Sequence, residues 1–555
     1  MTSSVPSNLE IAQDHELESI ADLAGRYGLI PTDYDTYGRF KAKVDLGVLE
    51  RLADRPDGKL VCVTAITPTK AGEGKTTTSV SLTQGLGKLG RQPMLCLREP
   101  SLGPVFGIKG GAAGGGYAQV VPMEDLNLHF TGDIHAIGAA NNLLAAALEA
   151  HLLHGNKLGI DPLTIGWRRC LDTNDRALRQ VAVGLGGRAN GYPRETGFDI
   201  TAASEVMAIV AVASDLPDLR RRLGAITVAS THEGEPVTAD DLQAAGAMTV
   251  ILKETLKPNL IQTLEGQACL MHAGPFANIA HGNNSLVADK VALKLADIVI
   301  TESGFGSDMG MEKFLDIVCP IGGLAPSAVV VVATVRALKH HAGAPEGGLD
   351  AIEQGSANLA RHIAIVKRFG LEPVVAVNRR PEDTDEECEL VRRLALEQGA
   401  FAAELNEAFA KGGAGATALA EAVVDTCERP NTFAPLYELD ATISEKIETV
   451  ATRVYGAAGV SFLPAALDAM QTLADGGLDK VPICMAKTHL SLSHDPLLVN
   501  APEGFTVPIR DLRPYTGAGW IVALCGDMMT MPGLGISPAL QQVDIDETGR
   551  TVGLF

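Results

Sequence analysis

Short, nearly all-apolar runs recur along this chain of 555 residues, and loops or stretches of helical periodicity separate them. The run at residues 60–66 (LVCVTAI) lacks the alternation of a half-exposed strand and is typical of a strand buried on both faces of a parallel sheet. Residues 76–89 then carry apolar side chains on one helical face, and residues 94–97 form the next apolar run. This order predicts one right-handed βαβ unit.

The same pattern continues through most of the chain. Residues 8–54 carry apolar residues at roughly helical spacing, which predicts a largely helical N-terminal segment. Further buried strands are predicted at residues 225–228, 298–301, 329–332 and 374–377. The alternation favours an α/β protein with a doubly wound, mostly parallel sheet.

The loop after the first predicted strand has the composition of a phosphate-binding loop. Residues 69–76 read TKAGEGKT, which differs from G-x-x-x-x-G-K-[ST] only at its first position. Lys75 is placed to reach β- and γ-phosphate oxygens, and Thr76 is placed to put its hydroxyl on Mg²⁺. The nucleotide-binding residues predicted are Thr69, Lys70, Ala71, Gly72, Glu73, Gly74, Lys75 and Thr76.

Given this loop, we predict a P-loop NTPase-like fold with two smaller α+β domains. Residues 1–365 would form the nucleotide-binding domain, with room for an inserted subdomain. Residues 366–480 would form a second α/β domain, and residues 481–555 a small C-terminal domain. The acidic stretch at residues 381–389 is expected to be a surface loop that leads into a helix.

Two more anion-binding features follow the second predicted strand. Arg98 stands at the carboxyl end of that strand, where α/β folds bind ligands, and its planar guanidinium suits phosphate or carboxylate. On spacing alone a structural ion pair, for example with Glu99, is equally plausible. The glycine-rich stretch at residues 107–120 (GIKGGAAGGGYAQV) suits no packed helix or strand. It predicts a mobile loop or an anion-binding nest, and a lid over a reactive intermediate is the functional interpretation.

Composition narrows the class of partner. The formal charge of −21 disfavours nucleic acid and anionic membrane surfaces as partners. The nine cysteines include no C-x-x-C pair and mostly lie in apolar runs, which indicates reduced, buried thiols. The N-terminus has acidic residues where a signal peptide needs basic ones, and the apolar runs, such as residues 328–333, are too short to span a bilayer. We therefore expect a cytoplasmic protein.

Together these stretches resemble formate–tetrahydrofolate ligase. Residues 107–117 match that family's first signature without a change, and residues 332–343 (VATVRALKHHAG) are similar to the second, departing at Ala342. The similar blocks leave no residues for a dehydrogenase or cyclohydrolase domain, so the chain resembles the monofunctional bacterial form. Further similar blocks lie at residues 131–146, 167–179, 195–209, 274–285, 301–314, 411–421 and 526–535.

The resemblance implies that ATP, formate and tetrahydrofolate give ADP, phosphate and 10-formyltetrahydrofolate through formyl phosphate. It also implies ATP with Mg²⁺ and a monovalent cation (K⁺ or NH₄⁺) as cofactors, tetrahydrofolate as a substrate, and a homotetramer. The catalytic residues expected are Lys75, Arg98, Asp133 and His135, although an isolated Asp-x-His is more often structural. The substrate-binding residues expected are Arg98, Glu99, Lys109, Gly110, Gly111, Tyr117, Phe305, Arg380 and Phe409.

One region departs from the family pattern. The usual Asn-x-Phe-Pro is Asn378-Arg379-Arg380-Pro381 here, and Phe409 stands where a tryptophan is often found. The resemblance implies that these positions face a flat ring, on which Phe409 and the Arg380 guanidinium could still stack.

Two other functions fit parts of the sequence. A different P-loop ligase or ATPase, such as a dethiobiotin-synthase-like enzyme, would share TKAGEGKT but not the glycine-rich signature. A nucleotide switch would need no second anion pocket. Histidines 272 and 281 have the same status as His135, whereas a metal site at histidines 151 and 154 is disfavoured.

Overall fold

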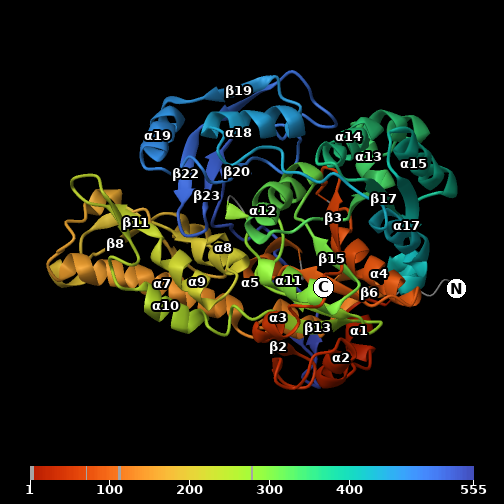
Figure 1. Cartoon of the computed structure of the whole chain (residues 1–555), viewed down its shortest axis with the longest axis horizontal. Coiled ribbons are helices and arrows are strands. Elements are labelled where there is room, and N and C mark those ends of the chain that lie inside the picture. The colour runs from red at the N-terminus through yellow and green to blue at the C-terminus, as the bar shows by residue number, and fades with distance from the viewer. Residues whose placement is uncertain (1–5, 71, 110–113, 277–278, 555) are drawn as a thin grey trace.

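The computed structural model describes residues 6–70, 72–109, 114–276 and 279–554. Within these ranges a 12-stranded sheet runs through the molecule, and its central strands are parallel (Figure 1). The parallel strands, in sheet order, are β14 (Ala268–Met271), β4 (Pro93–Leu97), β15 (Ile298–Glu302), β3 (Lys59–Ala65), β16 (Ala328–Ala333), β17 (Pro373–Asn378) and β18 (Ala402–Asn406). The predicted α/β class and mostly parallel sheet are confirmed. The domain boundaries stay predictions, but strand pairing puts β17 and β18 in the same sheet as β3.

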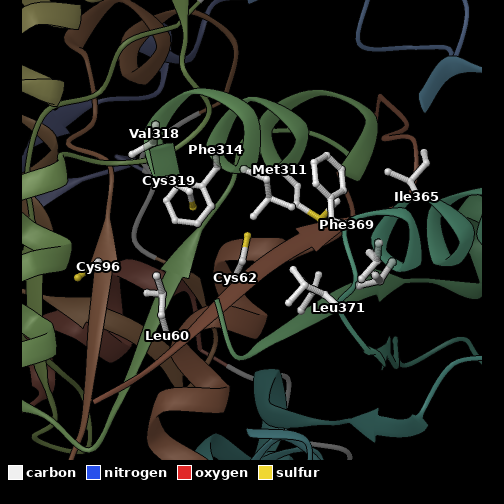
Figure 2. Close-up of a cluster of buried hydrophobic side chains, with 14 of the residues drawn as sticks. Leu60, Cys62, Cys96, Met311, Phe314, Val318, Cys319, Ile365, Phe369 and Leu371 are labelled. Atoms are coloured by element: carbon white, nitrogen blue, oxygen red, sulfur yellow. The ribbon is translucent and has the colours of Figure 1, made fainter. Parts of the chain in front are cut away.

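The side chains of β3 explain why its sequence is apolar without alternation. Leu60 and Cys62 pack on one face of the sheet, in a cluster that includes Phe314 (Figure 2). Val61 and Val63 pack on the other face, in a cluster that includes residues of α4 (Lys75–Lys88). Burial on both faces therefore fixes β3 at the centre of the sheet, as the sequence predicted.

The N-terminal segment is only partly helical, so the prediction of a largely helical 8–54 is wrong in its middle. Two antiparallel strands occupy that part and continue the sheet through β13 (Asn259–Thr263), which is antiparallel to β14. The prediction failed because the apolar residues keep a helical spacing across a turn that ends the second helix. Gly28 in this turn has a φ of 77°, which a helix does not continue through. The N-terminal elements are α1 (Asn8–Asp14), α2 (Ile20–Arg26), β1 (Tyr34–Thr36), β2 (Ala42–Val44) and α3 (Gly47–Arg51).

The segment between β6 (Ala118–Val121) and β13 forms a helical layer beside the sheet, with its own apolar cluster. The strand predicted at residues 225–228 appears as β11 (Thr227–Ser230), but it pairs only with β12 (Pro236–Thr238), outside the main sheet. The helices of this layer are α6 (Met123–Asn127), α7 (Asp133–Leu153), α8 (Glu205–Val212), α9 (Leu216–Gly224) and α10 (Ala245–Leu252). Its short strands are β7 (Arg169–Cys170), β8 (Val181–Val183), β9 (Arg194–Thr196) and β10 (Phe198–Asp199).

By length and composition, α7 is the one described helix that could cross a membrane. It packs against α10 and α8 through a buried stripe that includes Ile137, Leu144 and Leu148. A core helix passes the same test, so this feature is weak evidence for a membrane span.

The rest of the chain covers the sheet and adds a C-terminal layer (Figure 1). In that layer β20 (Ile483–Ala486), β23 (Trp520–Leu524) and β22 (Asp511–Tyr515) form one small sheet, and β19 (Gly459–Phe462) pairs with β21 (Thr506–Ile509) in another. The remaining strands are β5 (Gly114–Gly115), β24 (Asp544–Ile545) and β25 (Thr551–Val552). The remaining α-helices are α5 (Leu102–Pro104), α11 (Leu286–Leu295), α12 (Cys319–Gly322), α13 (Val335–His341), α14 (Leu349–Arg368), α15 (Asp385–Glu397), α16 (Ala408–Lys411), α17 (Thr417–Cys427), α18 (Ile443–Val450) and α19 (Pro464–Asp475).

Candidate functional site

The predicted phosphate loop joins β3 to α4, so a strand precedes it and a helix follows it, as the motif requires. Gly72 and Gly74 both have φ angles of 72°, a left-handed conformation that glycine adopts without strain. Gly74 is the residue before the 14-residue helix α4. The backbone N–H groups of the first turn and the dipole of α4 therefore point at the space in front of the loop and favour an anion there.

Glu73 holds the loop in shape from inside. Its buried carboxylate accepts hydrogen bonds from the Thr69 backbone N–H (2.8 Å) and the Thr69 hydroxyl (2.8 Å). The other carboxylate oxygen accepts one from the hydroxyl of Thr334 (2.7 Å), the residue before α13. The side chain of Glu73 thus braces the loop, which leaves its backbone for a ligand. Ala71, another predicted loop residue, lies outside the described residues, and Lys70 is exposed.

Asn378, at the end of β17, fixes the loop from the other side. Its side-chain amide donates to the carbonyls of Glu73 (2.8 Å) and Gly74 (3.1 Å). Its amide oxygen accepts from Thr78 of α4 (2.8 Å) and from the Asn406 amide (2.8 Å). In the sequence, Asn378 stands out only as part of the motif that departs from the family pattern. Its position at the carboxyl end of a predicted buried strand, where α/β folds bind ligands, could have marked it as a site residue.

Lys75 faces a carboxylate that the sequence analysis did not single out. Its Nζ lies 3.7 Å from Oε1 of Glu302, the last residue of β15, and Ser79 of α4 donates to the other oxygen of Glu302 at 3.3 Å. The side chains of Lys75 and Glu302 are only 14% and 8% exposed, so their charges interact through little water. Thr76 begins the first turn beside them and is partly buried.

Arg98 follows β4, which neighbours β15, so its strand ends at the same edge of the sheet. Burial lowers the pKa of Arg98, and the Glu302 carboxylate opposes this shift. The guanidinium lies against the backbone of Gly304, where a Cβ atom would be 3.0 Å from Nη2 and 3.1 Å from Nη1. A side chain at Gly304 would thus push the guanidinium away, so the close packing of Arg98 explains why this position is glycine.

Glu99, the residue after Arg98, and Asp133, the first residue of α7, are two buried acidic residues whose charges interact. Glu99 is buried, and one of its carboxylate oxygens has no hydrogen-bond partner within the described part of the chain. Burial raises the pKa of Glu99 well above its usual value, and Asp133 adds to the rise. Both oxygens of Asp133 lie 2.8 Å from Nζ of Lys43, and the two side chains are 1% and 3% exposed. His135 lies outside this ion pair, with its Nε2 2.8 Å from Nδ1 of His129.

The end of the glycine-rich stretch packs against the start of α16. Tyr117 N–H donates to the carbonyl of Phe409 at 3.0 Å, and a Cβ atom on Gly115 would lie 3.0 Å from the Phe409 ring and 3.6 Å from the hydroxyl of Thr77. The residues brought together beside α4 are therefore Tyr117 and Phe409, both more than 40% exposed. Gly110 and Gly111 lie outside the described residues, as does the predicted lid around them, and the Lys109 side chain is not described.

Phe305 and Arg380 reach the site from different sides. Phe305 follows Gly304 with a φ of 57°, and its ring stacks on His489 with a centroid distance of 4.5 Å. Arg380 donates from Nη2 to the carbonyl of Gly72 at 3.1 Å, so this side chain contacts the phosphate loop.

The remaining candidates have structural surroundings. His272 is buried between the Ser285 hydroxyl and the Thr255 carbonyl, each 2.6 Å away, and burial lowers its pKa to about 4. Burial, and then Arg98, lower the pKa of His281 to about 3. His151 accepts the Leu158 N–H at 3.1 Å. All nine cysteines are buried and free, as predicted, and the described residues contain no metal-binding cluster of histidine, cysteine and acidic side chains.

Along nearly its whole length, the chain is similar in sequence to proteins of one family. The family model for formate–tetrahydrofolate ligase matches residues 6–555. Proteins named formate–tetrahydrofolate ligase from Desulforamulus reducens and Roseiflexus sp. (strain RS-1) are 60% and 56% identical, and one from Saccharopolyspora erythraea is 54% identical. Each alignment covers 99% of this chain and 100% of the relative. The two rival interpretations lose their support, and the chain belongs to the formate–tetrahydrofolate ligase family.

Proposed function

We propose that the chain is an ATP-dependent ligase that joins formate to tetrahydrofolate and releases ADP and phosphate through a formyl phosphate intermediate. One observation carries the proposal: Lys75, at the start of α4, and Arg98, after β4, both interact with the carboxylate of Glu302, which ends the strand between β4 and β3. The phosphate loop therefore has a second cation beside it, at a position where a small anion could meet the γ-phosphate. A simple nucleotide switch does not need this second cation.

The proposed chemistry has two steps. A formate oxygen attacks the γ-phosphorus, the bond to the β–γ bridging oxygen breaks, and ADP leaves. N10 of tetrahydrofolate then attacks the formyl carbon, and phosphate leaves as the C–O bond breaks. Lys75 would neutralise the γ-phosphoryl group, and Arg98 would hold formate and then formyl phosphate, because phosphoryl transfer depends mainly on positioning and charge neutralisation. The proton that N10 loses passes to a base or to solvent, and Asp133 and His135 stay candidates for a metal contact or for proton transfer.

The first turn of α4 also has oxygen donors that suit Mg²⁺. Thr76 supplies a hydroxyl, and Glu302 supplies a buried carboxylate at the carboxyl edge of the sheet. Mg²⁺ is usually held by one or two protein oxygens together with substrate phosphates. The metal would supply charge neutralisation at the phosphates. A monovalent cation is implied by the family resemblance alone.

The exposed aromatic rings support a folate site beside the nucleotide. Phe409 is 44% exposed and Tyr117 is 41% exposed, and both lie at the end of the glycine-rich stretch next to α4. Flat rings bind well to such exposed aromatic faces. Phe305 would bound the site on the side of the C-terminal layer, through its contact with His489.

We also propose that the chain forms a homo-oligomer, for which a homotetramer is the prediction from resemblance. The outward stripe of α7 and that of α10 are both apolar, and the two helices pack side by side. Val250 of α10 is 76% exposed. A continuous apolar face of this kind is typical of an interface between subunits. The exposed apolar positions, which follow the exposed His135 at the start of α7, are Ala139, Leu143, Ala146, Ala150 and Leu153 on α7 and Gly246, Ala247, Val250 and Ile251 on α10.

The deciding experiment mixes the protein with MgATP and formate, with and without tetrahydrofolate. The product 10-formyltetrahydrofolate is followed by absorbance after acid conversion. We expect folate product only when all three substrates are present. ATP hydrolysis without any folate product would refute the proposed ligase reaction.

A further inference from the structure

Two arginines from separate elements converge on the tip of the phosphate loop. Arg336 of α13 donates from Nη2 to the carbonyl of Gly72 at 3.3 Å, and Arg380, which follows β17, donates to the same carbonyl at 3.1 Å. Gly72 lies three residues before Lys75, on the outer side of the loop. The second arginine is the residue at which the chain departs from the expected Asn-x-Phe-Pro pattern.

Two other cationic side chains nearby, Arg379 and Lys339, already have carboxylate partners. Arg379 lies 2.6 Å from Asp385, and Lys339 of α13 lies 2.6 Å from Glu387. In contrast, the guanidinium of Arg380 forms no ion pair with any residue that the structure describes. The guanidinium donates to a loop carbonyl, and its charge only opposes the rise that burial causes in the pKa of the nearby Asp383 carboxyl, so its remaining N–H donors can bind a ligand anion.

The closeness of the two guanidinium groups has an electrostatic effect. Burial lowers the pKa of Arg336, and the positive charge of Arg380 lowers it further, against the opposing effects of Glu73, Glu382 and Asp383. The carboxylate of Glu73 already accepts three hydrogen bonds inside the loop. An anion placed between the two guanidinium groups would relieve their repulsion.

The backbone of Arg380 is fixed before any ligand binds. Its N–H donates to Oδ2 of Asp383 at 2.8 Å, and the Asp383 N–H donates back to the Arg380 carbonyl at 3.1 Å. Pro381 inside this turn restricts the backbone further. The guanidinium is therefore held near the loop at a reduced entropic cost of binding.

We infer that Arg380 binds the phosphate chain of the nucleotide and, with Arg336, clamps it against the outer side of the phosphate loop. This inference rests on the proposed binding of ATP. It assigns Arg380 to phosphate rather than to stacking on a ring, because its guanidinium is directed at the loop carbonyl and forms no ion pair with a described residue. Arg380 would then select nucleotides by the number of their phosphates.

The test compares adenosine, AMP and ADP, each titrated calorimetrically with Mg²⁺ into the wild type, Arg380→Met and Arg379→Met. The Arg379→Met control removes a neighbouring arginine that is already paired with Asp385. Loss of one charge-assisted hydrogen bond should weaken ADP binding by about tenfold or more in Arg380→Met. Adenosine binding should change less than about twofold, and the ADP dissociation constant should depend less on salt. The control should bind ADP like the wild type.

Arg380→Lys keeps the charge, so it should recover part of the lost ADP affinity and guards against a folding artefact. An equal loss for adenosine and ADP would assign Arg380 to the ring and overturn the inference. Unchanged ADP binding in Arg380→Met would also overturn it. If the wild type itself binds neither ADP nor ATP, the proposed function fails as well, so the two failures are distinguishable.

Discussion

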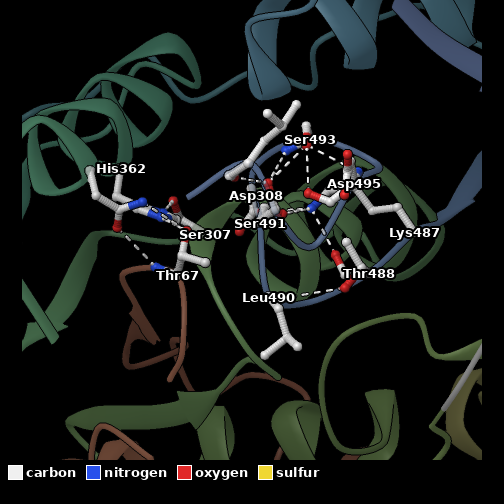
Figure 3. Close-up of polar contacts among 12 residues, drawn as sticks. Thr67, Ser307, Asp308, His362, Lys487, Thr488, Leu490, Ser491, Ser493 and Asp495 are labelled. Carbon is white, nitrogen blue, oxygen red and sulfur yellow. Dashed lines mark hydrogen bonds and ion pairs between the residues drawn. The ribbon is translucent and has the colours of Figure 1, made fainter. Parts of the chain in front are cut away.

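The ion pair between Lys487 and Asp308 gives a sharp test of how the C-terminal layer is held to the phosphate-loop sheet (Figure 3). Nζ of Lys487 lies 2.7 Å from Oδ2 of Asp308 and also donates to the carbonyls of Ser491 (2.6 Å) and Thr488 (3.1 Å). The two paired side chains are 0% and 2% exposed. Lys487 follows β20, whereas the Asp308 side chain lies beside Gly306, two residues after the glycine that packs on Arg98.

Replacing Lys487 with methionine keeps the volume roughly constant and leaves the Asp308 carboxylate buried without its cation. An uncompensated buried charge of this kind costs about 3–5 kcal/mol of unfolding free energy. Replacing both partners, in Lys487→Met with Asp308→Leu, removes the unpaired charge. The double variant should therefore recover most of the loss, to within about 1–2 kcal/mol of the wild type.

A chain of this size does not unfold in one step, so the assay needs a local probe. Trp520 is buried in β23, the strand next to β20, and the other tryptophan, Trp167, can be replaced by phenylalanine. Urea unfolding followed by Trp520 fluorescence then reports on the C-terminal layer. A loss below about 1 kcal/mol in Lys487→Met, or a double variant as unstable as the single one, would refute the reasoning.

Four other outcomes are expected. Lys75→Ala should abolish turnover with only a modest change in melting temperature, since Ser79 and Arg98 still interact with the Glu302 carboxylate; a large loss of stability would contradict a role in ligand binding. Arg98→Ser should reduce formyl phosphate formation far more than ATP affinity, and equal losses would remove its proposed role. Val250→Glu should lower the molar mass measured by sedimentation, because it puts a charge on the apolar α10 face; an unchanged mass would exclude this face as the interface. Burial lowers the pKa of His362 to about 4, so the unfolded chain binds the proton first as pH falls. The stabilising contribution of His362 should therefore be present above pH 6.5 and decrease by about 3 kcal/mol between pH 6.5 and pH 4. Urea unfolding of the wild type and of His362→Gln over this pH range measures the contribution. Identical pH profiles of the two proteins would contradict a lowered pKa of His362.

The central part of the fold could be predicted because its signals are local. The β3 run is apolar without alternation, and TKAGEGKT follows it directly, so a strand, a phosphate loop and a helix were readable from consecutive residues. The strand predicted at residues 225–228 shows the limit of the same signal. Apolar composition predicted a strand, but it did not show that this strand pairs in a local hairpin with β12 and stays outside the main sheet.

The candidate site could be predicted only in part for a similar reason. Lys75 and Arg98 belong to motifs or strand ends that stand out in sequence. Glu302 and Asn378 look ordinary, and they become site residues only because their strands end beside β3 and β16 in the sheet. A sequence-only argument would need the strand order before it could bring these four residues together.

The strand order also explains how an acidic protein can hold several anions. The formal charge of −21 is spread over 555 residues, and at physiological ionic strength charges farther apart than about 8 Å are largely screened. The potential at the phosphate loop is therefore set by the nearest groups. These are the N-terminal end of α4, Lys75, Arg98 and the two arginines on Gly72, against the carboxylates of Glu302, Glu382 and Asp383. The carboxyl edge of the sheet concentrates positive charge locally, so the global charge has little influence on nucleotide binding at that edge.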